Sequence, residues 1–313
     1  MAPIATLAAS APKATDLRSD LDLAHWEFER ILELSLQIKA NPQRFARALE
    51  GRYLSLLFEK PSLRTRLTFE LAIKQLGGDA VAQMGPIAER EPIKDVARNL
   101  ERWTHCIVAR VFSQHTVDQL AEWASIPVIN ALSDRFHPCQ ALADMQTLRE
   151  RFGRLKGLKL VFVGDANNVA HSLMLCAARA GMEFVLSSPP GVDPDAATLA
   201  AAQAMAVERG ASIELIRDPR QAVNGAHAVY TDVWASMGQE HEAQQRRQVF
   251  QPYQVTADLM RLARPEAVFL HCLPAHRGEE ATDAVLESPA SVVFDQAENR
   301  LHAQKALLVH LLS

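Results

Sequence analysis

Short apolar runs alternate along this chain with longer stretches in which apolar residues recur every three or four positions. The run 158–164 (LKLVFVG) is typical of a buried strand, because it is short, almost wholly apolar and ends in glycine. The stretch 93–104 is typical of a helix, with Ile93, Val96 and Leu100 on one face. Comparable runs predict further strands at 54–58, 80–84, 106–112, 126–131, 184–187, 212–216, 228–231, 267–270 and 292–294. Strands that alternate with helices in this way predict parallel sheets.

The length of 313 residues indicates two domains, since one domain usually takes about 100–200 residues. We expect an α/β fold of two doubly wound parallel-sheet domains of similar size, joined by interdomain helices. The helix that opens at His137 is expected to cross between them, which puts the domains at 1–150 and 151–313. The closing helix, 299–312, is expected to pack back on the first domain.

The composition is that of an ordinary globular protein, and the formal charge of −4 argues against a general nucleic-acid binder. No apolar run approaches the roughly 18–20 residues that span a bilayer, and the first residues lack the basic start and apolar core of a signal peptide. The four cysteines are widely spaced and form no C-x-x-C pair: Cys106, Cys139, Cys176 and Cys272. We therefore expect a cytoplasmic protein without a disulfide framework or a structural zinc site, which binds neither membranes nor nucleic acid.

The stretch FEKPSLRTRLTFE leads from a predicted strand through a polar turn into a helix. Ser62 is a good N-cap for that helix, whose first amides lack internal partners and favour an anion. Arg64 and Arg66 add planar guanidinium groups that suit phosphate or carboxylate. Taken alone, the motif is equally typical of an ordinary capped helix with solvated arginines.

Other polar residues also lie near or after the carboxyl ends of predicted strands: Arg110, His137, Asn167, Asn168, Asp232 and Cys272. Each has an ordinary explanation, such as a surface ion pair, a helix cap, a turn or an inert buried thiol. Because the carboxyl ends of parallel strands share one edge of a sheet, their joint occurrence there predicts a single ligand site. The turn after 158–164 lacks the G-x-G-x-x-G phosphate loop, which argues against a dinucleotide-binding dehydrogenase.

The motifs SLRTR, HPCQALAD, DVWASMG, HCLP and AENR together resemble the aspartate/ornithine carbamoyltransferase family, from about Leu21 to the C-terminus. The segments 232–238 and 271–274 resemble its ornithine branch. The resemblance implies transfer of the carbamoyl group of carbamoyl phosphate to the side-chain amine of L-ornithine, which gives L-citrulline and phosphate in arginine biosynthesis. It also implies a carbamoyl phosphate-binding first domain, an ornithine-binding second domain, and a homotrimer or a multiple of trimers.

The resemblance assigns residues to both substrates. The carbamoyl phosphate site would comprise Ser62, Leu63, Arg64, Thr65, Arg110, His137, Gln140, Cys272, Leu273 and Arg300. The ornithine site would comprise Asn168, Asp232, Ser236 and Met237. Arg110 and His137 would donate to the carbonyl oxygen, while Asp232 and Cys272 would flank the amine, where a carboxylate or a thiolate helps to remove its proton. The resemblance implies neither a metal nor an organic cofactor.

Two departures from the family pattern affect these assignments. Leu63 stands where threonine is common, which should matter little if this position acts through its backbone amide. In the loop Gln83–Arg90, Pro86 stands where many ornithine enzymes direct a glutamine or histidine into a neighbouring subunit's site. This loop therefore leaves N-acetylornithine, N-succinylornithine or putrescine open as alternative acceptors. A non-catalytic homologue that keeps the fold is a separate alternative, which missing phosphate or carbonyl ligands would favour.

Overall fold

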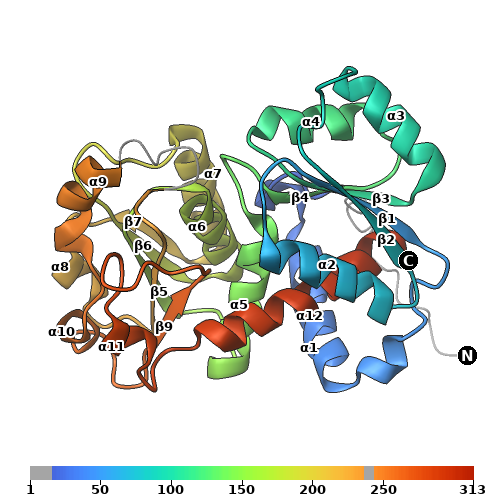
Figure 1. Cartoon of the computed structure of the whole chain (residues 1–313). Helices are drawn as coiled ribbons and strands as arrows, with labels where there is room; N and C mark the ends of the chain where they lie inside the picture. Colours follow the sequence, from blue (N-terminus) through green and yellow to red (C-terminus); the bar gives the residue numbers. More distant parts are fainter. Residues whose placement is uncertain (1–15, 236–242) are drawn as a thin grey trace, which may run out of the picture.

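The computed structural model describes residues 16–235 and 243–313, which form two parallel sheets side by side (Figure 1). The first sheet has the order β2-β1-β3-β4 and the second the order β7-β6-β5-β8-β9, with every strand pair parallel. The first half contains α1 (His25–Ala40), β1 (Tyr53–Phe58), α2 (Leu63–Gln75), β2 (Asp79–Met84), α3 (Ile93–Trp103), β3 (Cys106–Arg110), α4 (Gln114–Trp123), β4 (Val128–Leu132) and α5 (Pro138–Phe152). The second contains β5 (Lys159–Val163), α6 (Asn168–Ala180), β6 (Glu183–Ser187), α7 (Ala196–Arg209), β7 (Ser212–Leu215), α8 (Pro219–Val223), β8 (Ala228–Thr231), α9 (Ala243–Phe250), α10 (Ala257–Met260), β9 (Val268–His271), α11 (Asp283–Leu286) and α12 (Val293–Leu312). The predicted fold class is confirmed.

Helices cover both faces of each sheet, so most strands are buried on both sides and read as continuous apolar runs, whereas the edge strands β2 and β7 are largely exposed. In β5, Leu160 and Phe162 face the core under α6 and α7, while Val161 and Val163 face the core under α8, α10 and α11. The first sheet lies between α3 and α4 on one face and α1, α2 and α12 on the other (Figure 1). This double burial explains why short apolar runs were a reliable sign of these strands.

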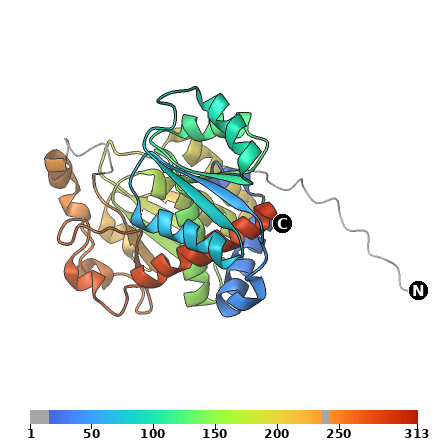
Figure 2. The ribbon, with the colours of Figure 1, turned by 45° about the vertical axis from the view of Figure 1, so that its right-hand side comes forward.

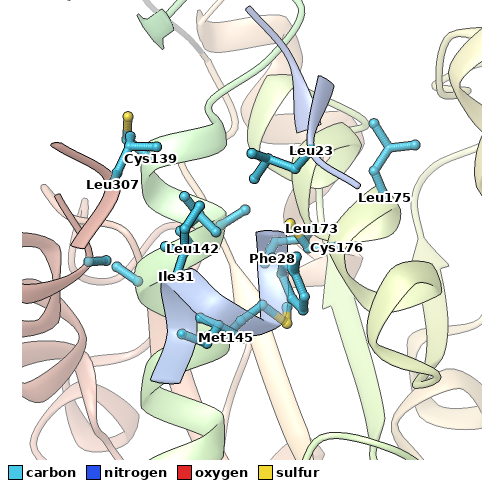
Figure 3. Packing of buried hydrophobic residues seen from close by; sticks show 14 of the residues in the cluster. Leu23, Phe28, Ile31, Cys139, Leu142, Met145, Leu173, Leu175, Cys176 and Leu307 are labelled. Atoms are coloured by element: carbon cyan, nitrogen blue, oxygen red, sulfur yellow. The ribbon is translucent and has the colours of Figure 1, made fainter. Parts of the chain in front are cut away.

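Helices α5 and α12 lie where the two halves meet. Helix α12 packs against α1, α2 and α5, and Figure 2 shows it running alongside α2. Figure 3 shows the apolar packing beside α5, where Phe28 and Ile31 of α1 lie near Leu142 and Met145. One continuous core therefore connects α1, α5, α6 and α12.

The strand predicted at 292–294 is wrong. Ser291 makes only an isolated bridge to Phe269, and α12 begins at Val293 instead of at the predicted residue 299. The first turns of this helix bury Gln296 and Arg300, whereas Phe294 is 67% exposed. Because the buried face is polar here, the apolar pattern did not reveal the helix start.

None of the helices in the described part of the chain combines the length and the apolar composition that a membrane span requires.

Candidate active site

A cleft of about 850 Å³ lies at the carboxyl ends of the strands of both sheets. The sequence-predicted residues that line it are Ser62, Leu63, Arg64, Arg110, His137, Gln140, Asn168, Asp232, Cys272, Leu273 and Arg300. Thr65 does not line the cleft, because its side chain is fully buried next to the lining residue Arg64. Ser236 and Met237 lie outside the described residues. The cleft therefore brings together, from widely separated parts of the chain, nearly all the residues that the sequence suggested.

The wall formed by the first half of the chain together with α12 is strongly cationic. Ser62 caps α2, with its Oγ accepting the backbone N–H of Thr65 at 3.3 Å. The Thr65 hydroxyl accepts hydrogen bonds from Arg300 Nη2 at 2.7 Å and from Arg110 Nη1 at 3.4 Å. Burial first and the neighbouring Arg300 second lower the pKa of Arg110 to about 10, so it stays charged at neutral pH. Clustered buried guanidinium groups at a helix N-terminus favour an anionic ligand.

Two atoms of this wall point to the same conclusion. Among the described residues, the buried Nε atoms of Arg110 and Arg300 have no hydrogen-bond partner. Arg66 behaves differently from what the sequence suggested, because its Nε donates to Glu70 at 2.7 Å and its side chain does not line the cleft. Of the two arginines in the motif, only Arg64 lines the cleft.

His137 is the N-cap residue of α5 and is almost fully buried. Burial, reinforced by Arg300 and Arg110, lowers the pKa of this histidine well below its usual value, so the ring is neutral. Its backbone N–H donates to Ser172 Oγ at 2.9 Å, which fixes the start of α5. A neutral imidazole retains one N–H that can donate to a carbonyl oxygen.

A buried amide–carboxyl network supports Arg300 from behind. Gln140 Oε1 accepts Arg300 Nη1 at 3.1 Å, and Gln140 Nε2 donates to Asp144 Oδ1 at 2.8 Å. Gln296 Nε2 donates to the same oxygen of Asp144 at 2.7 Å. Burial raises the pKa of Asp144 to about 7. Sequence reasoning missed Asp144 and Gln296, although the place of Asp144 one helical turn after Gln140 in HPCQALAD could have suggested it.

The opposite wall carries Asp232 and Cys272. The Cys272 thiol donates to Asp232 Oδ1 at 3.0 Å, and the backbone N–H of Val233 donates to the same oxygen at 2.8 Å. Burial and the nearby Asp232 carboxylate raise the pKa of Cys272 well above its usual value. Cys272 is thus a neutral thiol, and Asp232 accepts its hydrogen bond.

The two adjacent asparagines after β5 have different tasks. Asn167 Oδ1 caps α6 by accepting the N–H groups of Val169 and Ala170, while its Nδ2 donates to Asp232 Oδ2 at 2.7 Å. Asn168 Nδ2 donates to the backbone oxygen of Ser133 at 2.6 Å, at the end of β4. The sequence pointed to Asn168 and gave no sign that Asn167 orients Asp232.

The loop 83–90, whose sequence departs from the family pattern, lies away from the cleft. Gln83 and Pro86 line a separate hollow of about 680 Å³ beside β2 and α3, together with Val81 and Trp103. The backbone N–H of Ile87 donates to Glu59 Oε1 at 3.4 Å, which ties the loop to the turn before α2.

Asp232, His271 and Cys272 are close enough to be considered as metal ligands, since their ligand atoms lie within 4.8 Å of one another. The described contacts engage all three residues in hydrogen bonds: Cys272 with Asp232, and His271 with Glu280 and the backbone of Leu273. We therefore interpret the group as a hydrogen-bonded cluster.

Each half of the chain matches a family model of its own. Residues 15–150 match the family model "Aspartate/ornithine carbamoyltransferase, carbamoyl-P binding domain", and residues 156–311 match "Aspartate/ornithine carbamoyltransferase, Asp/Orn binding domain". The chain is 53% identical over 306 residues to the ornithine carbamoyltransferase of Symbiobacterium thermophilum, with 96% of this chain and 99% of that protein covered. It is 54% identical over 265 residues to the anabolic ornithine carbamoyltransferase of Pyrococcus furiosus, with 84% of each covered.

The solved structure of the ornithine carbamoyltransferase from Pyrococcus furiosus superimposes with a TM-score of 0.93 at 48% identity, covering 96% of this chain and 97% of that one. Matches in both halves of the chain, together with a near-complete structural match, confirm the resemblance that the motifs suggested. The chain belongs to the aspartate/ornithine carbamoyltransferase family.

Proposed function

We propose that this enzyme transfers the carbamoyl group of carbamoyl phosphate to the side-chain amine of L-ornithine, giving L-citrulline and phosphate in arginine biosynthesis. The observation that carries the proposal is the division of one cleft into a cationic wall around Arg64, Arg110 and Arg300 and an opposite wall with Asp232 and Cys272. An anionic acyl phosphate suits the first wall, and a cationic amino acid suits the second. Both substrates would meet between the sheets.

At the cationic wall, the phosphate would lie on the first amides of α2, from Ser62 to Thr65, and on the Arg64 guanidinium. Arg110 and the neutral His137 would donate to the carbonyl oxygen, where negative charge grows as the amine attacks. One such donor is typically worth about 3–4 kcal/mol in the transition state. Gln140, Arg300 and the backbone carbonyls of Cys272 and Leu273 would hold the rest of the carbamoyl group.

At the other wall, Asn168 and Asp232 would hold ornithine, and Ser236 and Met237 would complete this site by similarity to the family. The side-chain amine has a solution pKa near lysine's ~10.4 and must lose a proton before it attacks. Asp232, oriented by Asn167 and Val233, is placed to accept hydrogen bonds from this amine. The Cys272 thiol would lie beside the amine and orient it, so that the lone pair of the amine nitrogen points toward the carbamoyl carbon.

We further propose that residues 1–150 form the carbamoyl phosphate-binding domain and 151–313 the ornithine-binding domain, and that the enzyme works in the cytoplasm. The four free cysteines support the last point.

A homotrimer, or a multiple of it, is also part of the proposal. It is supported by an apolar stripe on the outer face of α2, where Leu63, Leu67 and Leu71 are 72%, 46% and 44% exposed. The neighbouring edge strand β2 adds Val81, which is 69% exposed. Exposed apolar stripes of this kind mark contact surfaces.

The decisive experiment is carbamoyl transfer from carbamoyl phosphate to five acceptors assayed in parallel: L-ornithine, N-acetylornithine, N-succinylornithine, putrescine and aspartate. We expect citrulline from ornithine with a kcat/KM far above the other four, because an acylated α-nitrogen would remove the cation that an anionic wall favours. A preference for an acylated ornithine would contradict this assignment. The absence of phosphate release with all five would refute the transferase function itself.

A further inference from the structure

A buried histidine–glutamate pair lies directly behind the loop that carries Cys272. His271 ends β9, Glu280 follows the loop, and both side chains are fully buried. His271 Nε2 lies 3.1 Å from Glu280 Oε1, and the same oxygen accepts the backbone N–H of His276 at 2.6 Å. Neither residue lines the cleft, so their burial calls for another explanation.

The other ring nitrogen of His271 identifies the tautomer. The backbone N–H of Leu273 donates to His271 Nδ1 at 2.9 Å. A backbone N–H can only donate, so Nδ1 must be the unprotonated nitrogen and the proton must be on Nε2. The Nε2–H then donates to Glu280, which holds the ring in this tautomer.

The residue held by this bond has an unusual backbone. Leu273 has a φ of +58°, in the left-handed region that branched side chains rarely occupy. Such a conformation is strained for a residue with a Cβ, so contacts around it must hold it in place. The Nδ1 acceptor of His271 is one of these contacts, and it acts on the amide between Cys272 and Leu273. Both of these residues line the cleft.

We propose that His271, held as the Nε2–H tautomer by Glu280, is a positioning residue that fixes the Cys272–Leu273 peptide for carbamoyl transfer. The kinetic part rests on the proposed function. Loss of the Nδ1 acceptor frees the Leu273 N–H, and Leu273 relaxes from positive φ, which turns the Cys272–Leu273 peptide away from its orientation. The Cys272 and Leu273 carbonyls then leave the positions from which they face the carbamoyl group.

Two near-isosteric variants separate the two nitrogens of the ring. In His271→Asn, the side-chain oxygen can occupy the place of Nδ1 and accept the Leu273 N–H, although the side chain no longer reaches Glu280. In His271→Gln, the amide reaches the place of Nε2 but leaves no acceptor at Nδ1. We expect kcat with ornithine to fall about 100-fold in His271→Gln, the cost of a small misplacement, and about tenfold or less in His271→Asn.

A second readout does not depend on turnover. Amide hydrogen exchange of Leu273 should be slow in the wild type and in His271→Asn and fast in His271→Gln, and the ring ¹⁵N resonances of wild-type His271 should show Nε2 protonated. Equal kcat in the two variants, or a protected Leu273 amide in His271→Gln, would overturn the proposal. A wild type without turnover would refute the proposed function, while the exchange and ¹⁵N data would still test the positioning.

Controls separate positioning from stability. His310 of α12 is buried away from the cleft, and its Nε2 lies 3.1 Å from Oε1 of Glu27 in α1. His310→Gln should therefore lower stability and leave kcat unchanged. If the His271 variants do not fold, Glu280→Gln and Glu280→Leu apply the same test. The glutamine oxygen can accept from Nε2–H and preserve the tautomer, whereas leucine cannot. Equal kcat in these two variants would also contradict the proposal.

Discussion

The thiol of Cys272 donates a hydrogen bond to Asp232, with Sγ 3.0 Å from Oδ1. This contact follows from strand register, because Thr231 pairs with His271 where β8 and β9 run in parallel. The next residue of each strand is then Asp232 on one side and Cys272 on the other. Two side chains that are 40 positions apart in sequence thereby form a hydrogen-bonded pair at the edge of the sheet.

The first prediction concerns this pair. Asp232→Asn and Cys272→Ala should each lose most turnover, on the order of 100-fold for Asp232→Asn, because the amine loses its proton acceptor or its orienting thiol. Carbamoyl phosphate should still bind to both variants, since the cationic wall and the backbone carbonyls remain. Stopped-assay kinetics combined with calorimetric titration of carbamoyl phosphate measure the two properties separately. Near-normal turnover in both variants would exclude the roles given to them.

The second prediction concerns the geometry of the cationic wall. Arg110→Lys keeps the positive charge but loses the planar fork that contacts Thr65 and would reach the carbonyl oxygen. We expect kcat to fall about 100- to 1,000-fold, the usual cost of a lost oxyanion donor. The control is Arg66→Lys, since Arg66 is paired with Glu70 outside the cleft and should tolerate the change. Equal activity of the two variants would show that charge alone suffices at Arg110.

The third prediction is a pH dependence of stability from Asp144. Burial raises the pKa of Asp144 from 3.8 to about 7, so the folded state holds this proton more tightly than the unfolded state. The resulting stabilisation is fully present below about pH 4 and is lost as the pH rises through about 7. One pKa unit is worth about 1.4 kcal/mol, so the shift corresponds to about 4 kcal/mol.

Asp144→Asn tests this, because the asparagine oxygen can accept the same bonds from Gln140 and Gln296 but cannot titrate. Between pH 4 and pH 8, the free energy of unfolding of the wild type should fall relative to that of the variant, as measured by urea denaturation. Asp20, whose pKa burial raises to about 6, is present in both proteins and cancels from the comparison. A difference that stays constant with pH would contradict the assignment.

The fourth prediction separates the two tasks of Asn167. Asn167→Ser keeps an oxygen that can cap α6 but loses the amide that orients Asp232. We expect little change in stability and a kcat/KM for ornithine about tenfold lower or more, the cost of one hydrogen bond to a charged group. The KM for carbamoyl phosphate should not change. Asn167→Ala should show the same kinetic loss and, in addition, a lower melting temperature, since the cap is removed as well.

The fifth prediction concerns assembly. Leu67→Glu places a charge in the middle of the exposed stripe on α2 and should dissociate the oligomer. Val207→Glu is the matched control, because Val207 on α7 is 82% exposed and lies in the other half of the chain. Sedimentation of the wild type and both variants measures the result. A trimeric Leu67→Glu variant would move the interface away from this stripe.

Local patterns of residues were enough to predict most of the helices and strands and the edge of the sheets at which the ligand site lies. Short runs buried on both faces revealed the strands, caps such as Ser62 revealed helix starts, and the order of strands and helices implied parallel sheets. These signals are readable because each depends on residues a few positions apart. The motifs then pointed to most of the residues that line the cleft, and together they suggested the family.

Which side chains meet in the cleft depends on the three-dimensional fold. The contact between Arg300 and Thr65 joins residues 235 positions apart, and strand register alone puts Cys272 beside Asp232. The polar buried face at the start of α12 hid that helix, because Gln296 and Arg300 are buried by partners supplied from other elements. Whether a polar side chain is solvated, paired or aimed at a ligand depends on such distant partners, and no local pattern in the sequence records them.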